Sequence, residues 1–180
     1  MNTIEEIPLN SPPEYVINPI RNLASKAEQP VLMICGKECR PARRVINVGN
    51  SYYYKNGVSL DWGDSTNFLK ILAPEANQCL INVYDDKTSN IGWHIDRVSN
   101  LKGNYVVSIS FAKNQEDISK VLAVMEFRQG KKGKAFLKIP LKHGTCLKFN
   151  AVEHSKAGIY HRVAKTEFPR INLTFREVSE

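Results

Sequence analysis

The stretch RINLTFRE (170–177) decides how this chain folds. Successive side chains of a β-strand point to opposite faces of the sheet, so every second residue shares a face. One face of this strand is apolar: Ile171, Leu173 and Phe175. The other face is polar: Arg170, Asn172, Thr174 and Arg176. The apolar face predicts contact with a hydrophobic core. The polar face is either a solvated edge or, inside a barrel, a receptor for an anion.

The same two-residue alternation recurs upstream of this stretch. It covers residues 79–84, 105–112, 121–128, 135–141 and 144–150. Short alternating strands separated by turn residues are typical of an antiparallel sandwich or barrel, so we predict a mainly β (α+β) fold. The turn RQGKKGK (128–134) predicts a hairpin tip. Its lysines are either solvated or in contact with phosphate.

Two short helices are expected before the strands. One covers residues 18–28, and the other covers residues 65–73, between Gly63 and Pro74. The opening is acidic and rich in proline, so residues 1–40 predict an extended lead-in of uncertain structure.

The composition indicates an ordinary globular protein. The chain has 180 residues, of which 42% are hydrophobic and 24% charged, so we expect a single domain over residues 1–180. Neither a secretion signal nor a membrane-spanning run is recognisable, which predicts an intracellular protein of the cytoplasm or nucleus. The four cysteines are expected to be reduced thiols. A net charge of +7 favours polyanionic partners, above all nucleic acid.

A possible metal-binding pair lies in NIGWHIDRVS (90–99), where a spacing of two places His94 and Asp96 on one face of a strand. Such a pair also occurs by chance, so a third ligand is required. His161 and His154 are the candidates. Two histidines and one carboxylate with open coordination positions suit non-haem Fe(II) enzymes that use oxygen.

These motifs, in this order, resemble the AlkB family of Fe(II)/2-oxoglutarate dioxygenases. The resembling features are Asn82 and Tyr84 in LINVY, His94 and Asp96, His161 in HRV, and the run PRINLTFRE (169–177). RRVINVGNSYYY (43–54) resembles the segment that covers the nucleotide in that family. The resemblance spans about residues 40–178. It implies a double-stranded β-helix (jelly-roll) with one or two N-terminal helices and a nucleotide-recognition segment.

The resemblance also implies roles for the site residues. His94, Asp96 and His161 would be the catalytic metal ligands and bind Fe(II). Arg170 would hold the distal carboxylate of 2-oxoglutarate, and Arg176 would lie near the other carboxylate. Further hydrogen bonds to the cosubstrate would come from Asn82, Tyr84 and Asn172. Thr174 is expected to be structural. With O2 as cosubstrate, the implied reaction is oxidative demethylation of N-alkylated bases in DNA or RNA, with release of formaldehyde, succinate and CO2.

The substrate contacts are open to more than one interpretation. Tyr52, Tyr54 and Trp93 could stack on a flipped base, or the tyrosines could pack on the sheet. A basic group could hold phosphates or form a solvated face: Lys37, Arg40, Arg43 and Arg44. We expect a monomer that acts on single-stranded DNA or RNA, without a membrane.

One departure from the family concerns the residues after His94-Ile95-Asp96. Repair members carry acidic residues there that meet the base edge, whereas this chain has Arg97, Val98 and Ser99. The change leaves the iron chemistry intact and alters what the site can recognise. A different base, an RNA substrate, or a 2-oxoglutarate oxygenase that hydroxylates a protein or an unalkylated nucleobase therefore remain alternatives. A jelly-roll binding module without catalysis is disfavoured by the complete ligand set.

Overall fold

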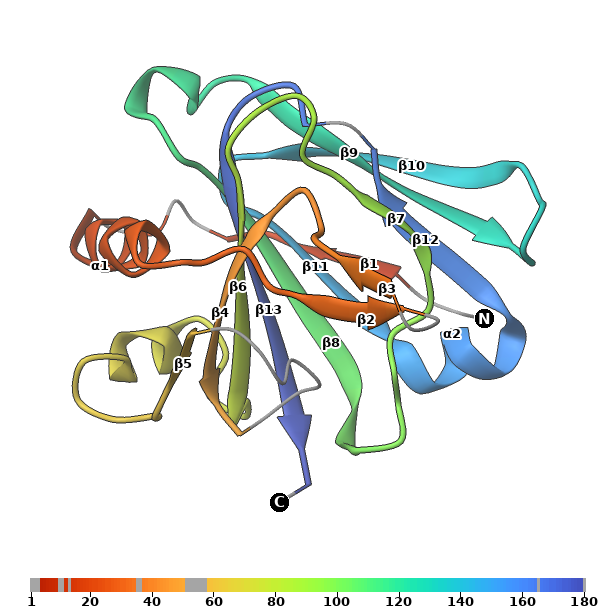
Figure 1. Ribbon diagram of the computed structural model, residues 1–180, viewed down its shortest axis with the longest axis horizontal. Coiled ribbons are helices and arrows are strands. Elements are labelled where there is room, and N and C mark those ends of the chain that lie inside the picture. Colours follow the sequence, from red (N-terminus) through yellow and green to blue (C-terminus); the bar gives the residue numbers. More distant parts are fainter. Residues whose placement is uncertain are drawn as a thin grey trace.

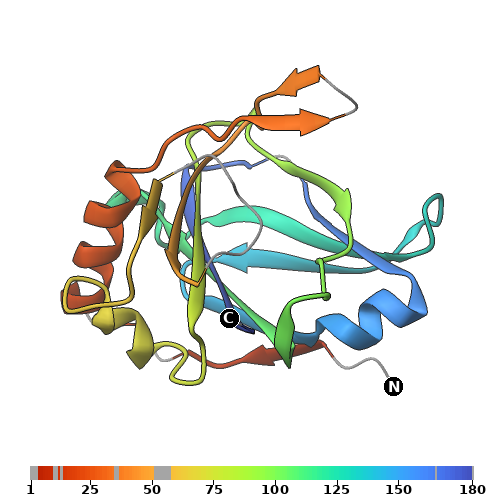
Figure 2. The same cartoon turned by 60° about the horizontal axis from the view of Figure 1, so that its bottom comes forward.

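The computed structural model describes residues 4–9, 12, 14–34, 37–50, 58–164 and 166–179. Its strands form two large sheets and one small hairpin (Figures 1 and 2). The major sheet has the order β1 (Ile4–Ile7), β11 (Thr145–Asn150), β8 (Leu101–Ala112), β13 (Arg170–Val178), β6 (Gln78–Tyr84), β4 (Arg44–Gly49) and β5 (Val58–Leu60). The minor sheet has the order β10 (Ala135–Lys142), β9 (Val121–Gln129), β12 (Ile159–Val163) and β7 (Ile91–His94). Neighbouring strands run antiparallel except β4 and β5.

The two sheets pack face to face around a shared apolar core. This core includes Val106 and Phe149 from the major sheet and Met125 and Phe127 from the minor sheet. Side chains that alternate along each strand supply it, because an antiparallel sheet with one polar face must bury the other. The predicted mainly β jelly-roll is confirmed.

A second core lies on the opposite face of the major sheet. The helices α1 (Glu14–Ser25) and η1 (Asn67–Ile71) cover this face. It contains the apolar residues of β13: Ile171, Leu173 and Phe175. The strand β13 pairs with β8 on one side and β6 on the other, so it lies inside the sheet with both faces buried. The alternation predicted for this strand is correct.

The N-terminal region differs from the predicted lead-in. Its strand β1 pairs with β11, and α1 begins at Glu14 instead of residue 18. Pro19 lies inside α1, where its ring removes one backbone donor but fits the helical φ. A hairpin of β2 (Leu32–Ile34) and β3 (Lys37–Cys39) follows and projects from the body of the molecule (Figure 2).

Two other helical segments differ from expectation. The predicted helix over residues 65–73 is a five-residue 3-10 helix, η1, with Leu69 in the core. An additional helix, α2 (Ala151–Ala157), was not predicted. Its sequence signals are present: the Asn150 side chain accepts a hydrogen bond from the Glu153 amide at 3.0 Å, and Gly158 ends the helix at φ 65°.

Cys39 is free and exposed, whereas Cys79 and Cys146 are free and buried; Cys35 lies outside the described residues. No helix of the described chain has the length and apolarity needed to cross a membrane.

Candidate active site

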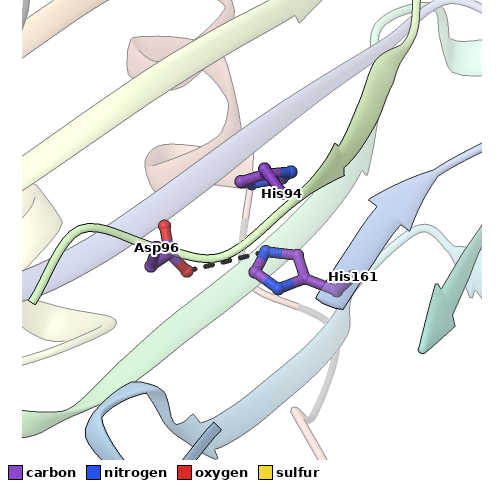
Figure 3. A group of neighbouring side chains, drawn as sticks. All are labelled: His94, Asp96 and His161. Carbon is purple, nitrogen blue, oxygen red and sulfur yellow. Dashed lines mark ion pairs between the residues drawn. The ribbon is translucent and has the colours of Figure 1, made fainter. Parts of the chain in front are cut away.

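Three potential metal ligands meet between the two sheets. His94 ends β7, Asp96 lies two residues beyond it, and His161 lies in β12, opposite His94 in the antiparallel register (Figure 3). One ligand atom from each of the three lies within 4.8 Å of the others, and the two imidazole rings are 4.2 Å apart. Donor atoms about 2.1 Å from a shared ion lie at most about 4.2 Å apart, so the three side chains are close to the arrangement that holds one ion. The group therefore has the composition and spacing of a metal centre with two histidines and one carboxylate.

The protonation of the imidazoles suits metal binding. Nδ1 of His94 lies 2.8 Å from the Gly92 carbonyl oxygen, which can only accept, so this nitrogen donates and Nε2 is left for a metal. Burial, helped by the neighbouring His94, lowers the pKa of His161 to about 3. Burial also lowers the pKa of His94. Both rings are therefore neutral at pH 7, which is the form that binds metals.

Asp96 is held ionised by Arg176. Burial alone would raise the pKa of Asp96, but Arg176 and the two imidazoles hold it well below its usual range. Nη2 of Arg176 donates to Oδ1 of Asp96 at 2.9 Å, while Oδ2 lies 3.6 Å from Nε2 of His161. The arginine at the end of the polar face of β13 thus orients the carboxylate at the metal site.

Arg170 is a buried cation without a carboxylate partner among the described residues. Its side chain is fully buried, and its guanidinium lies 3.9 Å from the centre of the Tyr84 ring. Nη1 donates to the Ser110 hydroxyl at 3.4 Å, but neither Nε nor Nη2 donates a hydrogen bond within the described chain. Burial lowers the pKa of Arg170, but guanidinium groups remain protonated in proteins. Unused donors on a buried cation fit an anionic ligand such as the carboxylate of a keto diacid.

A cavity of about 230 Å³ adjoins these groups. All three potential metal ligands line it, as do the other predicted cosubstrate residues Asn82, Tyr84, Asn172 and Arg176. Arg170 does not line it directly, because Tyr84 lies over its guanidinium.

The side-chain amides of Asn82 and Asn172, which both line the cavity, differ in how many hydrogen bonds they make within the protein. Asn82 has a buried side-chain oxygen without a hydrogen bond in the described residues. Asn172 donates to the Ser108 hydroxyl and the Ile109 carbonyl and accepts from Thr174. Asn172 is thus held in place by protein contacts, one of which comes from Thr174.

Of the three predicted base-stacking residues, the structure describes Trp93 alone. Tyr52 and Tyr54 lie outside the described residues. Trp93 is absent from the cavity lining; it precedes His94 in β7, and its ring contacts the guanidinium of Arg128 at 4.1 Å and that of Arg162 at 4.7 Å. Because neighbours in a strand point to opposite faces, the inward position of His94 turns Trp93 outward.

The four predicted basic residues lie in different parts of the structure. Arg43 lines the cavity, whereas Lys37 and Arg40 are exposed on the β2–β3 hairpin and after it. Arg44 forms an ion pair with Asp85 at 2.7 Å and donates to the Ala27 carbonyl at 2.8 Å. Arg44 therefore joins β4 to β6 and α1, which is a structural task.

His154, the alternative third ligand, does not belong to the metal-ligand group. It stacks on Phe149 at 5.2 Å in α2, and neither of its ring nitrogens has a hydrogen bond in the described residues. No local sequence pattern around His154 predicts this apolar packing.

Residues 59–176 match the sequence profile of the 2OG-Fe(II) oxygenase superfamily. The chain therefore belongs to this superfamily, whose cofactors are Fe(II) and 2-oxoglutarate, with O2 as cosubstrate. A search of curated protein sequences found no significant match.

Solved structures share the fold at low sequence identity. A prolyl-4-hydroxylase from Pseudomonas putida is 11% identical with a TM-score of 0.54, over 98% of this chain and 94% of that one. A 2OG-Fe(II) oxygenase family oxidoreductase from Burkholderia pseudomallei is 17% identical with a TM-score of 0.56, over 97% and 84% of the two chains. A prolyl hydroxylase from Trichoplax adhaerens, in complex with a peptide fragment of the hypoxia inducible factor oxygen degradation domain, is 12% identical with a TM-score of 0.60, over 98% and 84%.

Proposed function

We propose that this oxygenase removes N-methyl groups from bases of single-stranded DNA or RNA, in the manner of the AlkB family. His94, Asp96 and His161 would hold Fe(II). When bound, Fe(II) with 2-oxoglutarate and O2 supplies the oxidation of a C–H bond, with release of succinate and CO2. A hydroxylated N-methyl group then breaks down to formaldehyde and the unmodified base.

The chain's own residues prepare this chemistry by holding charges in fixed positions. Arg176 would keep Asp96 ionised and oriented toward the metal. The unused donors of Arg170 would take the distal carboxylate of 2-oxoglutarate beside Tyr84, because a guanidinium binds a carboxylate through two parallel hydrogen bonds. The buried oxygen of Asn82 would accept a further hydrogen bond. Most of the side chains around these groups are buried, and the low local dielectric strengthens each of these interactions.

The observation that carries the nucleic-acid assignment is the polar face of β13. It places Asn172, Thr174 and Arg176 in the cavity wall, with Arg176 bound to Asp96. These residues belong to PRINLTFRE (169–177), the run whose resemblance to the AlkB family implies a place for Arg176 near the metal-chelating carboxylate of 2-oxoglutarate. Arg43 and Arg97 also line the cavity, so its surroundings favour a substrate with negative charge.

A protein substrate is the second candidate. Two of the structures that share the fold are prolyl hydroxylases, one with a bound peptide, although a likeness at 11–12% identity concerns the fold alone. The missing acidic residues after Asp96 also favour a target other than the bases that repair members recognise. Hydroxylation of an unalkylated nucleobase is a variant of the same chemistry.

The test measures formaldehyde and succinate with Fe(II), ascorbate and 2-oxoglutarate. N-methylated single-stranded DNA, N-methylated RNA, their unmethylated counterparts and proline-containing peptides are compared. Formaldehyde that requires a methylated strand and is absent from His94→Ala supports the proposal. A gain of one oxygen atom in a peptide by mass spectrometry, without formaldehyde from any strand, would overturn it in favour of the second candidate.

A further inference from the structure

The outer face of the minor sheet differs from the cavity face in both charge and exposure. On β10, the side chains of Phe136, Lys138 and Lys142 are exposed and alternate with Leu137 and Ile139, which pack on the core between the sheets. Phe136 is 58% exposed. The hairpin that joins β9 to β10 extends this face beyond the body of the molecule (Figures 1 and 2). The outer face is therefore accessible over two strands and a projecting loop.

Positive charge is concentrated on this face. Residues 128–142 contain six basic residues and no acidic residue, in a chain whose net charge is +7. Arg162 on β12 adds a further cation. Glu126 on β9 is an acidic group of this face and is already shared by Lys138 at 2.8 Å and Arg162 at 2.6 Å. We call the basic residues of 128–142 together with Arg162 the outer basic face.

Aromatic rings lie among these cations. The Trp93 ring contacts the guanidinium groups of both Arg128 and Arg162, and Arg128 also lies 5.8 Å from the Tyr160 ring. Such stacked contacts order long side chains that would otherwise be mobile. Ordered cations beside an exposed ring, here Phe136, match a single strand, which presents phosphates and base faces in alternation. A lipid surface would use the charge but not the stacking pairs.

The outer basic face is connected to the candidate active site through one strand. Trp93 and His94 are neighbours in β7, the edge strand of the minor sheet, and point to its opposite faces. Arg97 lines the cavity just beyond the end of the same strand. A single-stranded nucleic acid whose target base enters the cavity can therefore pass around the β7 edge of the minor sheet and reach the outer face.

We propose that the outer basic face binds the phosphate backbone of single-stranded nucleic acid that flanks the target nucleotide. The inference rests on the proposed function only in taking nucleic acid as the substrate polymer. It assigns affinity to a surface separate from the chemistry, so binding and turnover are separable by mutation.

The experiment compares two variants of the full chain with equal loss of charge. The first replaces Lys131, Lys132, Lys134 and Lys138 by Gln. The control replaces Lys26, Lys87, Lys102 and Lys120 by Gln; these are exposed residues outside the minor sheet, and Lys102, like Lys138, has an ion-pair partner. Fluorescence anisotropy with an unmodified labelled strand of about 20 nucleotides gives the Kd over a range of NaCl concentrations.

We expect the first variant to raise the Kd about 10-fold or more near 0.1 M salt and to lower the salt slope by about 2 to 3, because each lost phosphate contact to a single strand removes about 0.7. The control should change both far less. Phe136→Ala should raise the Kd about 10-fold through lost stacking. Succinate formation without a strand should be unchanged in all three, which shows that they are folded.

The possible results separate this inference from the proposed function. Equal weakening in the first variant and the control, or wild-type binding to phosphatidylserine vesicles but not to oligonucleotides, would overturn the outer basic face as a nucleic-acid site. If the first variant alone weakens binding while no methylated strand yields formaldehyde, the surface stands and the demethylase proposal fails. If a methylated strand yields formaldehyde but the first variant binds as the wild type does, the demethylase proposal stands and the outer basic face is not a nucleic-acid site.

Discussion

The two faces of β13 are both buried, yet they contain opposite chemistry. One face packs Ile171, Leu173 and Phe175 into the core under α1. The other buries two arginines, one of which has a carboxylate partner and one of which has none in the described residues. Apolar burial stabilises a fold, whereas an unpaired buried cation costs free energy. Burial of the apolar face therefore stabilises the fold, whereas burial of Arg170 on the polar face is a cost that a bound anion would offset.

The largest effect is expected at the metal ligands, which come from β7 and β12 of the minor sheet and from the residues just after β7. His161→Ala should abolish detectable succinate formation, because two ligands cannot hold Fe(II) in the same way. His154→Phe is the matched control: His154 lies in an apolar stack without hydrogen bonds in the described chain, so an aromatic replacement should retain activity. The activities of the two variants are compared by measuring succinate with mass spectrometry. Loss of activity in the control but not in His161→Ala would make His154 the ligand.

The apolar face of β13 should respond in stability. Leu173→Ala removes a fully buried side chain, so the free energy of unfolding should fall by about 2–5 kcal/mol. Phe136→Ala, at an exposed position, should change it by less than about 0.5 kcal/mol. Denaturant unfolding without iron or 2-oxoglutarate measures both. A cost for Leu173→Ala as small as that of Phe136→Ala would show that this face is not a core.

The polar face should respond with the opposite sign. Arg170→Met removes a buried charge, so unfolding without ligands should cost about 1 kcal/mol more than in the wild type. The same variant should raise the KM for 2-oxoglutarate about 10- to 100-fold, because two charge-assisted hydrogen bonds are lost. Arg170→Lys keeps the charge but lacks the planar guanidinium, so its KM for 2-oxoglutarate should lie between those of the wild type and Arg170→Met. A destabilised Arg170→Met with an unchanged KM would show that Arg170 is structural.

The smallest effect concerns Arg44, an arginine that does have a carboxylate partner. The hydrogen bond from Arg44, together with Lys113 and despite partial burial, lowers the pKa of Asp85 from 3.8 to about 2. A carboxyl group with a lowered pKa stabilises the fold above its unfolded pKa and loses this contribution as the pH falls toward its folded pKa.

Unfolding curves between pH 6 and pH 2 should therefore show a loss of stability between about pH 4 and 2 that Asp85→Asn reduces. The amount is below about 1 kcal/mol, because the Asp85 side chain is 36% exposed and solvent screens the pair. Parallel curves for the wild type and the variant would show that the pair contributes nothing.

Strand periodicity correctly predicted which side chains share a face of a strand, because that depends only on neighbouring residues. The alternation of RINLTFRE placed every side chain of β13 on its correct face, and the spacing of His94 and Asp96 placed both at the cavity. The same spacing rule assigns Trp93 to the outer face, although the base-stacking interpretation placed it at the substrate. The capping signals of Asn150 and Gly158 were likewise present without being used for α2.

Long-range pairing could not be predicted from local patterns. The strand β1 pairs with β11 about 140 residues later in the sequence, and nothing in Ile4–Ile7 specifies that partner. The choice of His161 over His154 came from the family resemblance, and the structure explains it: β12 pairs His161 with His94, whereas α2 directs His154 into the Phe149 stack. The partner of Arg176 also depended on the packing of the two sheets.

The most direct test of the account is metal-dependent binding of 2-oxoglutarate. The cosubstrate is titrated under anaerobic conditions into the wild type, His161→Ala and Arg170→Met, each with and without Mn(II) in place of Fe(II), and followed by calorimetry. The account predicts a single equivalent bound by the wild type only when Mn(II) is present, with no binding to His161→Ala and weak binding to Arg170→Met. Equal binding by all three proteins, or binding that does not need the metal, would contradict it.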